Sequence, residues 1–263
     1  MKAKEIDLAA MIISPILASL IVLYLHTNLL LISTLLFFGL PSLYIICRNP
    51  GILAKSLIFA VPFAVILSVV FDIPAALNGA YVIPRTIFPF KIFGISTVEL
   101  YLFAFFWTFF SVLFYEHFFD HGRSGDRISF RFKKFLYYFI SLSVFIIAAW
   151  YLNRNLLYIP YFYFIGGMIF VVLPLIFFLR RYPKFLPRLV VVSIYFFYAL
   201  IIYELVALRT NEWIFPGKQF VGIVEILGYK FPLEELLIWM IACTPSLLAY
   251  YEFFADDRRL KSK

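Results

Sequence analysis

Charge is the scarcest property of this sequence. Lys, Arg, Asp and Glu together make up 14% of its 263 residues, whereas roughly a quarter of the residues in a soluble globular domain are charged. Hydrophobic residues make up 64% and aromatic residues 21%. Apolar runs of about 20 residues, the length that crosses a bilayer as a helix, recur along the whole chain. The composition excludes a soluble catalytic domain and predicts an all-α integral membrane protein.

Cysteine, histidine and glycine-rich loops are also scarce, and each shortage excludes a kind of site. The two cysteines, Cys47 and Cys243, lie in separate apolar runs, which excludes a disulfide framework and a zinc site. No glycine-rich dinucleotide fingerprint is present, so no flavin or nicotinamide cofactor is expected. His117 and His121 stand one helical turn apart, a spacing that can bind a metal. The equivalent stretch of the second half, Tyr251 to Asp257, contains no histidine. A solvated, mixed-charge helix end is therefore favoured, and no metal is expected.

Eight apolar runs define the expected membrane spans. They are Leu8–Leu25, Asn28–Cys47, Ile52–Phe71, Val98–Tyr115, Phe135–Leu152, Leu157–Leu179, Leu189–Leu205 and Pro232–Tyr251. Of the 23 basic residues, 17 fall on the side that carries both chain ends and 6 on the other. This bias accounts for the net charge of +8 without a nucleic-acid partner. By the positive-inside rule it places both termini in the cytoplasm of a cell-membrane protein.

The second half of the chain matches the first, which predicts two tandem four-helix repeats, residues 1–130 and 131–263. With four spans each, the two copies share one orientation and are related by an axis along the membrane normal. The aligned residues are, at an offset of 132, Phe71-Asp72 with Tyr203-Glu204 and Tyr81 with Trp213, and, at an offset of 136 after a four-residue insertion, Glu99 with Glu235 and Tyr115-Glu116 with Tyr251-Glu252.

Five acidic residues are expected to meet near the outer boundary of the membrane. They come from the ends of four spans and are Asp72, Glu99, Glu204, Glu234 and Glu235. Helix N-termini favour acids, which accounts for three of them. Asp72 and Glu204 stand at C-terminal helix ends, where the helix dipole disfavours them, so a functional cluster is the better explanation. Carboxylates crowded in a dry site cannot easily all ionise, which yields a general acid beside a general base.

Aromatic residues are expected to surround these acids. Trp239 lies one helical turn beyond Glu235, on the same face. Trp107, Trp213 and Tyr81 are further candidates. Aromatic faces stabilise a nearby cation through their negative π surfaces. The combination predicts proton-in, proton-out chemistry on an alkene, with a carbocation between the two steps.

Two stretches resemble the membrane-integral lycopene cyclase family, which occurs as two small subunits in bacteria and as fused copies in archaea and fungi. One is Pro232-Leu233-Glu234-Glu235 at a helix start, with Tyr251-Glu252 at the end of the same span. The other runs from Phe71-Asp72 to Tyr81 and has the family's small-residue, Gly and aromatic pattern. The resemblance covers nearly the whole chain as two tandem halves.

The resemblance implies carotenoid biosynthesis by a cofactor-independent isomerase of the intramolecular lyase type. An acid protonates the end group of lycopene, the cation closes to a ring, and a base removes a proton to leave a β-ionone ring. Glu234 and Glu235 would be the acid/base pair, Glu99 their partner from the other repeat, and Asp72 and Glu204 would tune or relay the proton. The expected partners are lycopene, a lipid-soluble polyene, and membrane lipids.

The sequence departs from the family in its first half, and this leaves alternatives open. Ser96-Thr97-Val98-Glu99 stands where the family has Pro-x-Glu-Glu, so Glu99 alone carries over. A hydratase acting on a related isoprenoid end group is one alternative. A proton-coupled carrier is another, for which the acids should lie near the bilayer midplane. A homo-oligomer and the roles of Glu116 and Glu252 also stay open.

Overall fold

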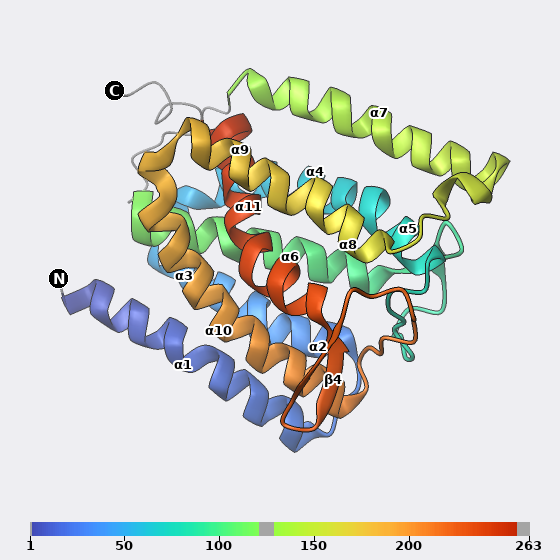
Figure 1. Cartoon of the computed structure of the whole chain (residues 1–263). Helices are drawn as coiled ribbons and strands as arrows, with labels where there is room; N and C mark the ends of the chain where they lie inside the picture. The colour runs from blue at the N-terminus through green and yellow to red at the C-terminus, as the bar shows by residue number, and fades with distance from the viewer. Residues whose placement is uncertain (1, 121–128, 257–263) are drawn as a thin grey trace.

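Eight helices in the described residues, 2–120 and 129–256, are long and apolar enough to cross a membrane in this computed structural model (Figure 1). The prediction of an all-α membrane protein with eight spans is confirmed. The spans are Lys4–Leu25, Leu30–Arg48, Pro50–Leu77, Val98–Asp120, Arg131–Leu152, Phe162–Arg181, Pro183–Thr210 and Glu235–Ala255. The first residue of α1 and the last described residues of the eighth span lie at the same end of the bundle (Figure 1).

The first four spans are built from several helical pieces. The elements are α1 (Lys2–Leu25); α2 (Leu30–Thr34), η1 (Leu35–Gly39) and α3 (Leu40–Arg48); η2 (Pro50–Ile52), α4 (Leu53–Leu67), η3 (Ser68–Asp72) and α5 (Ile73–Leu77); and α6 (Val98–Tyr115) with η4 (Glu116–Asp120). Here η2 is a short 3-10 turn, and η1, η3 and η4 are π-helical.

The last four spans are also built mostly from several helical pieces. The elements are α7 (Arg131–Leu152) and the 3-10 turn η5 (Arg154–Leu157); α8 (Phe162–Gly167), η6 (Met168–Val172) and α9 (Leu173–Arg181); the 3-10 turn η7 (Pro183–Phe185) and α10 (Leu186–Thr210); and η8 (Glu235–Ala242), α11 (Cys243–Tyr250) and η9 (Tyr251–Ala255). The segments η6, η8 and η9 are π-helical.

Four of the six π-helical segments in the described residues are followed by a proline. Each of η1, η3, η6 and η8 is followed within three residues by a proline, and these are Pro41, Pro74, Pro174 and Pro245. A proline has no N–H for the carbonyl four residues earlier and pushes that carbonyl outward. Neighbouring hydroxyls bind two of the released carbonyls: Tyr250 donates to Phe170 (3.1 Å) and Ser193 donates to Ile241 (2.7 Å). The spans therefore widen at prolines without leaving these backbone oxygens unpaired.

Two hairpins cover one end of the bundle, between the third and fourth and between the seventh and eighth spans. The first pairs β1 (Lys91–Ile92) with β2 (Ser96–Thr97), and the second pairs β3 (Ile223–Ile226) with β4 (Tyr229–Pro232). Pro232 was expected inside the eighth span, but it ends β4, and the helix begins after it. A proline at the end of a strand needs no ladder donor, so the hairpin takes this residue from the helix.

The first helix of each half of the chain packs against helices of the other half. The hydroxyls of Tyr195 and Tyr198 on α10 donate to the carbonyls of Met11 (3.2 Å) and Ile12 (2.8 Å) on α1. In the other half, α7 packs on α4 and η3, where Trp150 joins Val69 in a small apolar core. Figure 1 shows α1 and α7 at opposite edges and α6 and α11 between them. Each half therefore holds the first helix of the other.

Backbone positions in the two halves correspond closely. The segments η1 and η6 begin 133 residues apart, and so do η2 and η7. The third span contains the π segment η3, which has no counterpart in α10, and beyond it the spacing between matched residues is 132. The matched residues there are Ala80 and Glu212, whose backbone N–H groups donate to the carbonyls of Ala75 and Ala207, both at 2.9 Å. A π segment accommodates one extra residue, which explains the change. These matches are what the duplication requires, although the duplication itself stays a prediction.

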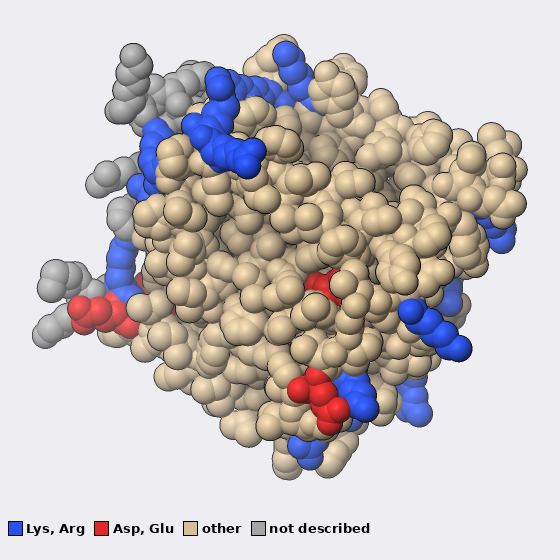
Figure 2. Space-filling model, viewed as in Figure 1, with Lys and Arg blue, Asp and Glu red and all other residues tan. Residues whose placement is uncertain are grey.

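Figure 2 shows how charge is distributed on one face. Lys and Arg gather at its two ends, and a broad belt between them is almost free of charged residues. Such a belt is what a hydrocarbon layer requires of the surface in contact with it.

Candidate functional site

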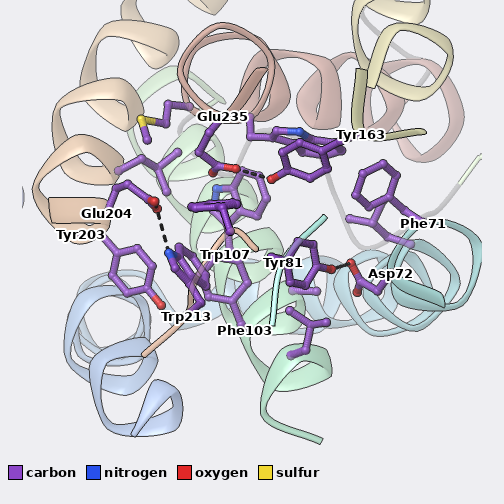
Figure 3. Close-up of a pocket in the computed structure, with 17 residues that line it drawn as sticks. Phe71, Asp72, Tyr81, Phe103, Trp107, Tyr163, Tyr203, Glu204, Trp213 and Glu235 are labelled. Carbon is purple, nitrogen blue, oxygen red and sulfur yellow. Dashed lines mark hydrogen bonds between the residues drawn. The ribbon is translucent and has the colours of Figure 1, made fainter. Parts of the chain in front are cut away.

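An apolar pocket lies at the hairpin end of the bundle and contains three carboxylates, Asp72, Glu204 and Glu235 (Figure 3). Its cavity volume is about 80 Å³. The residues that line it are Leu67, Phe71, Asp72, Tyr81, Leu100, Phe103, Ala104, Trp107, Tyr163, Leu200, Tyr203, Glu204, Trp213, Phe215, Glu235, Trp239 and Met240.

Each of the three carboxylates accepts a hydrogen bond from an aromatic side chain. Tyr163 donates to Glu235, Tyr81 donates to Asp72 at 2.6 Å, and the indole N–H of Trp213 donates to Glu204 at 3.2 Å. All three bonds are drawn in Figure 3. A buried acid held by one donor keeps its second oxygen available, so each group can be fixed in place and still exchange a proton.

Burial keeps the donor Tyr81 protonated. This residue lies in the loop outside the third span, and burial, with Asp72 as the next cause, raises the pKa of Tyr81 well above its usual value. The phenol therefore remains a donor to Asp72 throughout the physiological pH range.

Aromatic rings form most of the remaining wall. Trp239 stacks on Tyr163 with ring centroids 5.4 Å apart and contacts Phe71 at 4.3 Å. On the other side, Tyr203 and Phe103 stack at 5.6 Å. Trp107 stands between the two groups (Figure 3), and its indole N–H donates to Thr244 at 3.1 Å. A positively charged intermediate in this pocket would face several π surfaces at once.

The structure therefore brings together seven of the nine residues that sequence reasoning selected. They are Asp72, Glu204, Glu235, Tyr81, Trp107, Trp213 and Trp239. Sequence reasoning did not select Tyr163, Tyr203, Phe71 or Phe103. Tyr163 carries no motif and sits in the first turn of a span whose face toward the acids cannot be read from hydropathy.

Glu99 and Glu234 lie outside the pocket wall. The carboxylate of Glu99 accepts from the backbone N–H groups of Ile87 (2.5 Å) and Phe88 (3.1 Å). The carboxylate of Glu234 accepts from the backbone N–H of Val221 (2.6 Å). Both acids thus fasten the loop that precedes their own helix, and neither lines the pocket.

These contacts also correct the alignment of Glu99 with Glu235. Glu99 and Glu234, 135 residues apart, both accept from backbone N–H groups of the preceding loop, so Glu234 is the counterpart of Glu99. Further along the same spans, the matched residues Tyr115 and Tyr251 are 136 residues apart. The π segment η8 begins at Glu235 and absorbs the additional residue. Glu235 thus turns into the pocket because the helix widens at that point.

A second buried group of charges lies at the opposite end of the bundle. Lys55, which stands near the start of the expected third span, is buried in α4 and pairs with Glu116 (3.0 Å) and Asp256 (2.7 Å). Tyr115 donates to Glu252 (2.6 Å), and Tyr251 donates to Glu116. Glu116 and Glu252 therefore take part in the contact between the two halves of the chain.

Two further acids and a histidine belong to this end. Oxygen atoms of Glu116, Asp120 and Asp256 lie within 4.8 Å of one another, a grouping of the kind that can hold a cation. The ammonium group of Lys55 already supplies positive charge there. His117 contacts Asp7 through Nε2 at 2.9 Å, and its expected partner His121 lies outside the described residues.

Comparison of the sequence with protein-family models, with curated proteins and with solved structures gives no match in any of the three. A function must therefore be inferred from the pocket. Its three carboxylates, each held by one aromatic donor within an apolar aromatic wall, suit proton transfer to and from an apolar substrate.

Proposed function

We propose that this protein is a membrane enzyme that cyclises the end group of a lipid-soluble polyene, with lycopene as substrate and a β-ionone ring as product. The single observation that carries the proposal is the hydrogen bond from Tyr163 to Glu235 inside a pocket that also holds Asp72 and Glu204. The pattern at Pro232-Leu233-Glu234-Glu235, which resembles membrane-integral lycopene cyclases, supports it independently.

The reaction needs one proton delivered and one removed, and no redox cofactor. Glu235 as the acid transfers its proton to the terminal double bond, and the resulting tertiary cation is attacked by the next double bond, which closes the six-membered ring. Asp72 or Glu204 then accepts the proton that leaves the ring carbon, and a new double bond forms. Trp239, Tyr163 and Trp107 face the charge of the intermediate.

We also propose a membrane location and a topology for the protein. It resides in the cell membrane with both termini cytoplasmic, because most basic residues lie on the side that carries the termini. The two halves are tandem copies, supported by the matched turns at Ala80 and Glu212 and by the exchanged contacts of Tyr115 and Tyr251. One pocket then serves both ends of the substrate in succession.

Expression in a bacterium that accumulates lycopene tests the proposal. Extracted pigments are separated, and the wild-type chain is expected to yield one- or two-ringed carotenes. The Glu235→Gln variant should lose nearly all of this conversion although it is present in the membrane, and the exposed Glu225→Gln variant should match the wild type. A hydroxylated product would instead identify a hydratase. Unchanged lycopene with wild-type protein in the membrane would reject the proposal and leave the proton-coupled carrier.

A further inference from the structure

Glu212 is a buried carboxylate that the proposed reaction does not use. It follows α10 by two residues, its side chain is 0% exposed, and the adjacent Asn211 is exposed. Ser33 on α2 and Thr210 donate hydrogen bonds to one of its oxygens, at 2.5 Å and 3.0 Å. Its counterpart in the first half is Ala80, which occupies the same turn. This carboxylate is therefore not needed to form the turn.

The second oxygen of Glu212 has no hydrogen-bond partner among the described residues. Within the described residues, this oxygen, the hydroxyl of Tyr203 and the hydroxyl of Thr34 are all buried and have no hydrogen-bond partner. Tyr203 interacts electrostatically with Glu212 and lies beside Thr34. Figure 3 shows the Tyr203 hydroxyl directed away from Glu204. Because an unpaired buried polar atom costs about 1–3 kcal/mol, these atoms are where bridging water is expected.

Glu212 is also linked to the acids of the pocket. Glu204 interacts electrostatically with both Glu235 and Glu212. Glu212 follows Glu204 along the chain, beyond the end of α10 and toward the hairpin end of the bundle, so it is the outer member of this group of three interacting carboxylates. Burial raises the pKa of Glu212 to about 7, while the hydrogen bonds from Ser33 and Thr210 oppose the shift. A group with that pKa takes up and releases protons readily near neutral pH.

We propose that Glu212 is the port through which the pocket acids exchange protons with the outer aqueous phase, by way of Glu204 and water held beside Tyr203. The inference rests on the proposed function. Glu212 does not touch the substrate and acts through Glu204. In each cycle one proton enters the substrate and one leaves it, so the base can return its proton to the acid internally. The port exchanges these protons for solvent protons between turnovers, and no net proton is consumed.

Solvent deuterium measures the port directly. Membranes containing the protein are supplied with lycopene in D2O buffer, and the cyclic product is analysed by mass spectrometry. With wild-type protein, the ring is expected to carry close to one deuterium, because the acid re-equilibrates with solvent between turnovers. In Glu212→Gln, internal return dominates, and the deuterium fraction should fall at least threefold while cyclic product still forms. The exposed Glu225→Gln variant should keep the full deuterium fraction.

A second variant protects the test against a folding defect. Tyr203→Phe retains the ring, which packs against Phe37 and Phe103, and removes the hydroxyl beside Glu212. It should also lower the deuterium fraction of whatever product forms. A defect in folding or packing would lower the yield and leave the deuterium fraction unchanged. Full deuterium incorporation in either variant overturns the inference. Absence of cyclic product from the wild type would instead reject the proposed function.

Discussion

Val82 and Ile214 donate backbone hydrogen bonds to each other, and both N–O distances are 2.9 Å. They hold matched positions in the two halves, so exchanging the halves leaves the contact unchanged. The paired contacts of Tyr115 and Tyr251 have the same property at the opposite end of the bundle. Asp72 with Tyr81 and Glu204 with Trp213 are related in the same way within one pocket, which Glu235 makes asymmetric.

The first prediction separates the adjacent acids Glu234 and Glu235. Glu235→Gln should reduce cyclisation by about 10²–10⁴-fold, the usual effect of removing a general acid or base. Glu234→Gln keeps an oxygen that can accept from the N–H of Val221, so most of the activity should remain. Pigment analysis at equal amounts of membrane protein makes the comparison. Equal loss in both variants would contradict the assignment of Glu234 to loop positioning.

The second prediction concerns Tyr163. Tyr163→Phe keeps the ring that stacks on Trp239 and removes the donor to Glu235. Hydrogen bonds to charged groups contribute about 1.5–3 kcal/mol, so turnover should fall by about 10- to 100-fold. The exposed Tyr158→Phe is the matched control and should behave as wild type. Unchanged turnover in Tyr163→Phe would show that this bond does not position the acid.

The third prediction tests the loop contact of Glu99. Glu99→Ala leaves the N–H groups of Ile87 and Phe88 without their acceptor and should lower the free energy of unfolding by about 1–3 kcal/mol. Glu99→Gln retains an acceptor and should lose less. Thermal unfolding in detergent micelles gives the stability, and proteolysis of the loop reports its release. A loop equally resistant in Glu99→Ala would refute the contact.

The fourth prediction concerns the buried cation Lys55. Removing one partner of a buried ion pair leaves uncompensated charge and costs about 3–5 kcal/mol, so Lys55→Met should strongly destabilise the protein. Lys230 pairs with Glu225 at 3.5 Å on an exposed hairpin, where such pairs contribute about 0–1 kcal/mol. Lys230→Met is therefore the control. Similar melting temperatures for the two variants would contradict the prediction.

The fifth prediction is a pH dependence of stability that comes from Glu212. Its pKa is about 7 in the folded protein, whereas the ordinary value for a glutamate, which the unfolded chain is expected to have, is 4.5. The folded protein therefore binds the proton more tightly than the unfolded chain does. Protonation of Glu212 thus contributes to the free energy of unfolding below pH 4.5, and this contribution declines as the pH rises to 7 and is absent above. The difference amounts to about 3 kcal/mol. In Glu212→Gln, melting temperatures between pH 4.5 and 7 should depend less on pH than in the wild type; an identical profile would refute the shift.

The spans and most of the pocket follow from the sequence for clear physical reasons. Long apolar runs without charges have few alternatives to a membrane-spanning helix. Acids at the ends of those runs, such as Asp72 and Glu204, are costly enough that their positions indicate a function. Their aromatic partners Tyr81 and Trp213 follow each by nine residues, a spacing that the sequence shows in both halves.

The roles of neighbouring residues could not be predicted in the same way. Consecutive residues on an α-helix point about 100° apart, so which of Glu234 and Glu235 faces the pocket depends on the rotation of the helix. That rotation is set by the β3–β4 hairpin and by the π segment η8, and apolar patterning reports neither. Glu212 was missed because a single acid in a loop after a helix carries no periodic signal.

The exchange of first helices between the halves limits how this fold can be assembled. In a chain of half this length, ending before α7, the face of α4 that α7 covers would be exposed, and α1 would have no α10 to pack against. Two such chains could satisfy both surfaces only by associating, each lending its first helix to the other. Joining two such chains end to end would preserve every one of these contacts, make association independent of concentration, and allow the two halves to differ, as they do at Glu235 and Glu212.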